Sequence, residues 1–324
     1  MSRVTYIVVG WNNRDLLEEC FVSLGAQTYK NTHIIYVDND SKDDSVEFVA
    51  KQFPKIEIIQ TGYNSGFAVA NNIGIKEALK DESVSHVALI NSDATLDSAW
   101  TSKIITFASL KPKGALFQGT TLDYYNHNIV DSTHIFVSHN GQGTQGNWRN
   151  YYVKEFGPKR VFGVNAAACM ISRAFIEKQP FGDQVLDKSF FMYLEDVDLV
   201  TRAVVMGWDN YLVPDARAFH MGSASSGKNP GFSLYMTFRN NTGMLLKNFP
   251  IILIIRILPK LIRGDIETII TLRRQKRHGA IRKVLKGRLV GIIRMPLYIL
   301  KRIKLSRYRK ISREDLWNLM SKGY

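Results

Sequence analysis

Short apolar runs alternate with segments of helical periodicity through the first 120 residues. The runs are rich in valine and isoleucine, which favours strands, and they cover residues 4–9, 33–37, 56–60, 86–90 and 115–119. Between them, apolar positions three and four residues apart predict helices over residues 16–26, 45–52, 67–79 and 98–109. Continuous apolar strands separated by helices indicate a mostly parallel sheet with helices on both faces. The pattern therefore predicts an α/β fold of the Rossmann-like, doubly wound kind.

The pattern weakens and then resumes after residue 120. Residues 122–150 are rich in Asn, His and Gly, which predicts an irregular excursion from the core, either a lid over a binding site or an ordinary surface loop. A strand-like stretch then leads into a helix near Ser172. The segment FFMYLEDVDLVTRAVVMGW, residues 190–208, contains a helical pattern, and residues 211–220 again read as a strand.

The loops after the predicted strands are the places to look for chemistry. In doubly wound sheets, ligands bind outside the carboxyl ends of the strands. No GxGxxG follows the first strand and no GxxxxGK[ST] occurs, so neither the usual dinucleotide fingerprint nor a P-loop is supported. The loops carry carboxylates and amides instead.

Asp38 ends the second strand. A carboxylate in that position can accept hydrogen bonds from a nucleobase or a ribose. The competing interpretation is that Asp38, Asp40 and Ser41 cap the helix that begins near residue 45. That alternative fits Asp40 better than Asp38, which lies ahead of the capping position.

Asn91, Ser92 and Asp93 follow the buried fourth strand. Oxygen ligands at such a strand end suit Mg²⁺ or Mn²⁺ bridging a diphosphate. A turn capped by its own side chains is the alternative. His220, at the end of residues 211–220, could complete a mixed oxygen and nitrogen metal site with Asp93, although a single histidine is more often structural.

Three carboxylates, Glu195, Asp196 and Asp198, lie at the start of this helical pattern, within residues 193–199. Asp198 precedes Arg202 by four residues, which favours an intrahelical ion pair and a structural role. Asp196 has no partner at helical spacing, so it is the better candidate for a general base. A helix N-terminus lowers a carboxyl pKa, whereas a base requires a raised one, so desolvation or nearby anions would have to raise the pKa of Asp196.

Charge divides the chain after Pro250. Residues 251–324 carry 20 Lys and Arg against 4 Asp and Glu, whereas residues 1–250 carry 23 against 25. We expect a catalytic domain over residues 1–250 and a basic helical tail over residues 251–324. Charges interrupt the tail too often for a spanning helix. Its amphipathic spacing (Ile281, Val284, Leu285, Leu289, Ile292 and Ile293) is typical of helices that lie on an anionic membrane surface.

Two other interpretations of the tail remain open: packing of its apolar face on the catalytic domain, and nucleic-acid binding. The second is disfavoured because no aromatic stacking platform is interleaved with the basic residues, and we expect no nucleic-acid partner. Pro259 and Pro296 should kink or divide the tail helices.

Composition adds little else. The chain of 324 residues is 45% hydrophobic and 22% charged, as folded globular proteins are. Cys20 and Cys169 lie in apolar stretches and predict buried, reduced thiols rather than a disulfide or a thiolate metal site. The apolar run near the N-terminus is too short for a signal peptide, so we expect a cytoplasmic protein.

Six motifs taken in order resemble family 2 glycosyltransferases of the GT-A fold, in the branch that contains bacterial rhamnosyltransferases. They cover about residues 4–225 and read VGWNNRDLLEECFVSL, VDNDSKDDS, NSGFAVANNIGI, LINSDA, FFMYLEDVDLVTRA and GWDNYLVPDARAFH. The alternative of a sugar nucleotidyltransferase would require a Gly-rich, basic loop where GWNN stands. A non-catalytic binding protein for nucleotide sugars or nucleic acid is the alternative of another class.

The resemblance implies inverting transfer of a sugar, first of all L-rhamnose from dTDP-rhamnose, to a polyprenyl diphosphate-linked saccharide in surface polysaccharide synthesis. UDP-hexoses and UDP-galactofuranose remain alternative donors. The resemblance also implies a location on the cytoplasmic face of the cell membrane. It makes Asp196 the base, Asp93 and His220 ligands of Mg²⁺ or Mn²⁺, and Asp38, Asn64, Gly66, Asn72, Asn91 and Asp93 contacts of the nucleotide sugar. Asn91 stands where many relatives have a first carboxylate.

Overall fold

The protein is described by a computed structural model that covers residues 2–154, 157–222 and 230–322. Its centre is a sheet to which ten strands of the described chain belong. These strands are β1 (Arg3–Gly10), β2 (Thr32–Asp38), β3 (Glu57–Gln60), β4 (Val84–Asn91), β5 (Ala94–Leu96), β6 (Gly114–Asp123), β7 (Val130–Ser132), β10 (Lys159–Val161), β11 (Ala168–Ser172) and β12 (Asp209–His220). The main path runs β10-β12-β6-β11-β4-β1-β2-β3, with β5 on β12 and β7 on β6.

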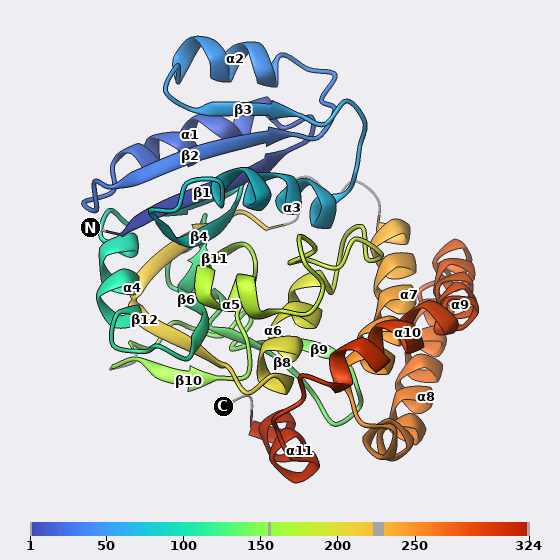
Figure 1. The fold of residues 1–324 in the computed structure, drawn as a ribbon. Coiled ribbons are helices and arrows are strands. Elements are labelled where there is room, and N and C mark those ends of the chain that lie inside the picture. The colour runs from blue at the N-terminus through green and yellow to red at the C-terminus, as the bar shows by residue number, and fades with distance from the viewer. Residues whose placement is uncertain (1, 155–156, 223–229, 323–324) are drawn as a thin grey trace.

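The sheet is mostly parallel, as predicted. Along the main path only β10 and β11 run against the other strands. Helices cover both faces (Figure 1): α1 (Arg14–Gly25), α2 (Ser45–Gln52) and α4 (Trp100–Ala108) on one, and α3 (Phe67–Ala78), α5 (Arg173–Lys178) and α6 (Glu195–Val205) on the other. Strand β1 shows the reason, because Tyr6 and Val8 enter one core while Ile7 enters the other.

The predicted elements of the first 120 residues agree with the structure to within a few residues. The helix predicted over residues 45–52 is α2 at both ends. Strand β6 is longer than its predicted core of residues 115–119, since it continues to Asp123. Ser172 caps α5, and its hydroxyl accepts a hydrogen bond from the Phe175 backbone. Both cysteines are buried and free, as predicted.

The excursion over residues 122–150 is more regular than predicted. It contains β7 and the separate hairpin of β8 (His134–Val137) and β9 (Gly143–Gly146). The hairpin packs on α6, where a Cβ placed at Gly143 would lie 2.9 Å from the side chain of Val197. The strands are short, and only β8 among these three puts apolar side chains at alternate positions into the core, Ile135 and Val137, so the surrounding polar residues hid the pattern.

The C-terminal region is helical and gathers on one side of the sheet domain (Figure 1). It consists of α7 (Pro230–Asn248), α8 (Ile251–Arg274), α9 (His278–Ile293), α10 (Met295–Ser306) and α11 (Arg313–Lys322). Pro296 stands in the first turn of α10 and divides it from α9, as predicted. Pro259 does not divide α8, in which it lies on an exposed face where water can satisfy the carbonyl that loses its partner.

The inner sides of these helices pack on the sheet domain. Met244, Leu253, Ile257, Tyr298 and Leu305 belong to the same apolar core as α3 and α6. The outer sides leave Ile and Leu exposed at helical spacing, and Val284, which we placed in that stripe, is buried instead. A boundary after Pro250 falls between α7 and α8, although α7 packs along α9 and α10. No described helix is long and apolar enough to cross a membrane.

Candidate active site

A cavity of about 740 Å³ lies at the carboxyl ends of β1 and β4, a size typical of ligand sites. Gly10 of β1 and Asn39 beyond β2 line it, together with residues from the loop before α6 and from the β8–β9 hairpin. Five of the predicted site residues line this one cavity. They are Asn64, Asn91, Asp93, Asp196 and His220.

Three other predicted residues do not line it. Asp38 is buried, and its carboxylate accepts hydrogen bonds from the Tyr36 hydroxyl (3.2 Å) and the Ser41 backbone (3.1 Å). The side chain of Asn72 makes two hydrogen bonds with the backbone of Leu186, at 2.7 and 2.8 Å. Those contacts hold Asn72 against the backbone of Leu186 and make Asp38 part of the turn that follows β2, whereas Asp38 does not cap α2.

Gly66 does not line the cavity but packs against Phe191, in the loop that precedes α6. Its φ of 81° is in the left-handed region, and a Cβ there would lie 2.4 Å from the ring of Phe191. The close approach lets the start of α3 hold the loop before α6, since the Ala68 backbone donates to the Phe191 carbonyl at 3.1 Å. Asn64 accepts from the Gly66 backbone and from Asn39, each at 3.1 Å.

His220 joins two carboxylates at the end of β12. Its Nε2 lies 3.2 Å from Asp93 Oδ1, and its Nδ1 lies 3.0 Å from Asp131 Oδ2. Burial alone would lower the pKa of His220, but its hydrogen bonds to Asp131 and Asp93 raise it to about 10. Asp131 thereby holds the ring so that the other nitrogen faces Asp93 and the cavity.

This arrangement fits a divalent cation bound together with a diphosphate. Asp93 Oδ1 and His220 Nε2 lie 3.2 Å apart, so both could hold one cation once Nε2 has released the proton that it shares with Asp93. Asn91 Oδ1 beside them is buried without a hydrogen-bond partner in the described protein, so it offers a further oxygen. No cluster of three or more acidic, His or Cys side chains that could hold a metal occurs in the described residues. A cation here would therefore depend on substrate phosphates for its remaining ligands.

Glu195 and Asp196 begin α6 at another wall of the cavity. Burial raises the pKa of Asp196 above its usual range, although backbone N–H groups of Val197 and Ala166 donate to the carboxylate and oppose the shift. Burial, and then the charge of Asp196, raises the pKa of Glu195 to about 8. Desolvation thus has the effect that a general base at a helix N-terminus requires.

The loop before α6 is held in an unusual conformation. Phe191, Tyr193 and Leu194 all have positive φ, between 65° and 68°. Asn240 of α7 places its amide nitrogen 2.7 to 2.9 Å from three carbonyl oxygens of this loop, those of Phe190, Met192 and Tyr193. The C-terminal helices therefore help to fix the backbone that leads into Asp196.

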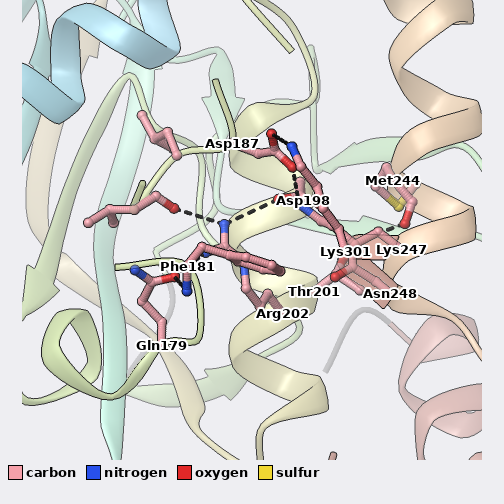
Figure 2. A network of polar contacts seen from close by, with 12 residues as sticks. Gln179, Phe181, Asp187, Asp198, Thr201, Arg202, Met244, Lys247, Asn248 and Lys301 are labelled. Carbon is pink, nitrogen blue, oxygen red and sulfur yellow. Dashed lines mark hydrogen bonds and ion pairs between the residues drawn. The ribbon is translucent and has the colours of Figure 1, made fainter. Parts of the chain in front are cut away.

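A buried charge network lies on the opposite side of α6 (Figure 2). Asp198 pairs with Arg202 at 3.2 Å, as the spacing predicted, and also with Lys247 at 2.7 Å. Lys247 contacts Asp187 at 2.6 Å, and Lys301 of α10 contacts the same carboxylate. Although burial opposes it, Lys247 and Lys301 hold the pKa of Asp187 well below its usual range.

Sequence reasoning missed several residues of the site. Asp131, Asn240 and the aromatic residues Trp11, Phe191 and Phe232 were not singled out, although all but the first two line the cavity. The only signal for Asp131 was its place in the His- and Asn-rich excursion. Nothing in the local pattern connects Asn240 with a loop some 50 residues earlier.

Comparisons with known proteins agree with this geometry. The family model of glycosyl transferase family 2 matches residues 5–181, which is more than half of the chain. A Mycobacterium tuberculosis (strain H37Rv) protein named N-acetylglucosaminyl-diphospho-decaprenol L-rhamnosyltransferase is 26% identical over 237 residues, 67% of this chain and 76% of its own. The Escherichia coli UDP-Glc:alpha-D-GlcNAc-diphosphoundecaprenol beta-1,3-glucosyltransferase WfaP is 33% identical over 94 residues, 29% of this chain and 36% of its own.

Solved structures show the same fold. GalNAc-T7 with UDP, GalNAc and Mn²⁺ superimposes with a TM-score of 0.59 at 12% identity, over 76% of this chain and 48% of that one. The Pyrobaculum calidifontis mannosyltransferase PcManGT with GDP-Man and Mn²⁺ gives a TM-score of 0.56 at 14% identity, over 97% of this chain and 87% of that one. With its GT-A sheet and a cavity at the strand ends, the chain belongs to glycosyl transferase family 2 and is a glycosyltransferase.

Proposed function

We propose that the protein transfers L-rhamnose from dTDP-rhamnose, with inversion, to a hydroxyl of a saccharide linked to a polyprenyl diphosphate. The M. tuberculosis relative, named for transfer of L-rhamnose to N-acetylglucosaminyl-diphospho-decaprenol, supports the sugar and the acceptor, and the match covers two thirds of this chain. WfaP, named for UDP-Glc and an undecaprenol-linked acceptor, keeps UDP-hexoses and UDP-galactofuranose as alternative donors. The product would be an intermediate of a bacterial surface polysaccharide.

One observation carries the proposal: Asp196, with a raised pKa, shares a cavity with the Asp93–His220 pair. In a single displacement, the acceptor oxygen attacks the anomeric carbon opposite the leaving diphosphate, through a transition state with oxocarbenium character. Asp196 would take the proton of the acceptor hydroxyl. Asp93 and His220 would hold Mg²⁺ or Mn²⁺, which stabilises charge on the departing diphosphate when it is bound.

Substitution of the base tests this assignment. We expect Asp196→Asn to lower transfer of labelled rhamnose by about 10²- to 10⁴-fold, because an amide cannot accept the proton. The variant should still bind the donor nucleotide, which isothermal calorimetry measures. Asp183→Asn, an exposed carboxylate remote from the cavity, is the matched control and should leave transfer unchanged.

Transfer by Asp196→Asn at a rate near that of the wild type would contradict the role of Asp196. The same assay with dTDP-rhamnose, UDP-glucose and UDP-galactofuranose decides between the donors. A protein that binds a nucleotide sugar but transfers none of these sugars, with Mg²⁺ or Mn²⁺ present, would be the non-catalytic alternative.

We also propose that the outer surface of the C-terminal helices lies on the anionic inner face of the cell membrane. Helix α8 exposes Ile255, Ile262 and Ile266 in a stripe, while Leu253 and Ile257 face the core. Exposed Arg and Lys residues flank the stripe, and residues 251–324 carry a net charge of +16. Exposed aliphatic side chains among cations match the apolar and anionic layers of a membrane surface.

Deleting residues 251–324 would expose the apolar core that they share with the catalytic domain. Substituting exposed residues of α8 is therefore the better test of membrane binding. We expect Ile255→Gln/Ile262→Gln/Ile266→Gln to reduce co-sedimentation with anionic vesicles at least tenfold, because three exposed aliphatic side chains can no longer enter the apolar layer of the membrane. Val22→Gln, at an equally exposed position of α1, should sediment like the wild type. Undiminished sedimentation of the triple variant would contradict the proposal.

A further inference from the structure

A second cavity, of about 700 Å³, adjoins the catalytic one where the sheet domain meets α7 and α10. Four cationic side chains line it: Lys188 of the loop before α6, Arg239 of α7, and Arg294 and Lys301 at α10. No carboxylate is among its described lining residues. We refer to this cavity as the cationic groove.

Its positive charge is only partly neutralised. Lys301 shares the carboxylate of Asp187 with the buried Lys247. Within the described chain, no carboxylate forms an ion pair with Lys188, Arg239 or Arg294. The guanidinium of Arg239 is mostly buried and donates to the carbonyls of Ser189 (3.3 Å) and Phe190 (2.5 Å).

The two arginines also repel each other. Burial, and then the charge of Arg294, lowers the pKa of Arg239. Arg294 donates to the carbonyl of Ser189 at 3.2 Å, which is a neutral acceptor. Cations brought together around a hollow without counterions form a site for an anion, and guanidinium groups suit phosphate oxygens in particular.

The position of the groove indicates which anion. Phe191 and Phe232 line both cavities, and their rings pack edge to face with centroids 6.3 Å apart. On the outer side, Leu297 lines the groove and is exposed, as are Ile293 and Leu300 beside it in sequence. From the cavity outward, the order is therefore a sugar site, a cationic site and an exposed aliphatic surface.

We propose that the cationic groove binds the diphosphate of the lipid-linked acceptor. The proposal rests on the proposed function, in which the acceptor is a saccharide, a diphosphate and a polyprenyl chain in that order. The saccharide would reach past Phe191 and Phe232 toward Asp196, and the chain would leave over α10 toward the membrane. Recognition of the diphosphate would place the acceptor hydroxyl at a fixed distance from the membrane surface, whatever the length of the lipid.

The test compares two acceptors that differ only in the diphosphate. One is N-acetylglucosaminyl diphosphate on a short prenyl chain, and the other is an alkyl N-acetylglucosaminide without phosphate. The variant is Lys188→Met/Arg294→Met, which leaves Arg239 and its loop contacts in place. The control is Arg282→Met/Lys283→Met, which removes the same charge from exposed positions of α9 outside the groove.

We expect the groove variant to raise KM for the diphosphate acceptor roughly 10- to 100-fold with kcat little changed, because charge-assisted hydrogen bonds to phosphate are lost. Its kcat/KM for the alkyl glycoside, and its hydrolysis of the donor, should stay within about twofold of the wild type. The control variant should keep the wild-type KM for both acceptors. Inorganic pyrophosphate should compete with the diphosphate acceptor in the wild type and weakly in the groove variant, whereas acceptor-free phosphatidylglycerol vesicles should not compete.

An unchanged KM for the diphosphate acceptor in the groove variant would overturn the inference while leaving the proposed function intact. An equal loss of kcat/KM with both acceptors would also overturn it, since the groove would then affect transfer without recognising the diphosphate. Competition by the vesicles as strong as by pyrophosphate would assign the groove to a phospholipid headgroup instead. A wild-type enzyme that transfers to the alkyl glycoside alone would overturn the proposed function itself.

Discussion

Asp196 and Asp198 lie two residues apart in α6, yet their surroundings differ in almost every respect. Asp196 faces the catalytic cavity, forms no ion pair in the described chain, and has a pKa raised by burial. Asp198 is fully buried on the other side and contacts Arg202, Lys247 and Asn248 within 3.2 Å. Asp196 is therefore the proposed base, in a cavity that no described Lys or Arg lines, whereas Asp198 is a structural link between cations.

The difference follows from where the C-terminal helices pack. Lys247 and Asn248 end α7, and Lys301 belongs to α10, so the network on the Asp198 side joins the tail to the catalytic domain (Figure 2). On the Asp196 side, the neutral amide of Asn240 in α7 holds backbone carbonyls of the loop before α6, and Arg239 of α7 donates to two carbonyls of the same loop. Lys247 and Lys301 thus lie behind α6, whereas no Lys or Arg side chain is among the described residues that line the cavity.

The largest effect on stability should come from Lys247→Met, on the Asp198 side of α6. The variant leaves Asp187 and Asp198 with fewer cations in a buried site, so we expect the free energy of unfolding to fall by about 3–5 kcal/mol. Denaturant unfolding in urea measures it. Lys247 lines neither cavity, so transfer per folded molecule at low temperature should fall far less than in Asp196→Asn.

Lys260→Met removes the same charge from an exposed position of α8 and should change stability by less than about 0.5 kcal/mol. A Lys247→Met variant as stable as this control would show that the network does not link the tail to α6, and the structural half of the comparison would fail.

How much could be predicted from the sequence also differs between the two sides of α6. Periodicity located the strands and helices of the first 120 residues, because each buries a continuous run or one face. The Asp198–Arg202 pair was predicted, since both residues lie on one helix. Lys247 was not, because its two carboxylate partners are 49 and 60 residues away in sequence.

The candidate site shows the same limit. Asn64, Asn91, Asp93, Asp196 and His220 line one cavity because strand ends and the start of α6 converge there. Asn72 resembled a ligand-binding residue in its motif, but its amide is bonded to the backbone of Leu186, a contact between segments 114 residues apart. The packed tail and the cationic groove arise from contacts between helices, which amphipathic spacing alone does not specify.

A smaller effect on stability should come from Glu195→Gln, which removes one of the two adjacent carboxylates at the N-terminus of α6. The pKa of Glu195 is about 8 in the folded protein, against 4.5 for an ordinary glutamate. Between these values the folded state keeps a proton that the unfolded state has released, so stability falls as the pH rises from about 4.5 to about 8. Glutamine cannot ionise, so the variant should gain up to about 1.4 kcal/mol per pH unit on the wild type, which is about 2.8 kcal/mol between pH 5.5 and pH 7.5.

Urea unfolding of both proteins at about pH 5.5, 6.5 and 7.5 measures the difference. Glu18→Gln, on the exposed side of α1, should show no such trend, because its carboxylate stays in water. A constant difference between wild type and Glu195→Gln at all three pH values would mean that Glu195 is ionised in the folded protein. Two adjacent buried anions would then stand beside the acceptor site, and the pKa of Asp196 would owe more to repulsion by Glu195 than to burial.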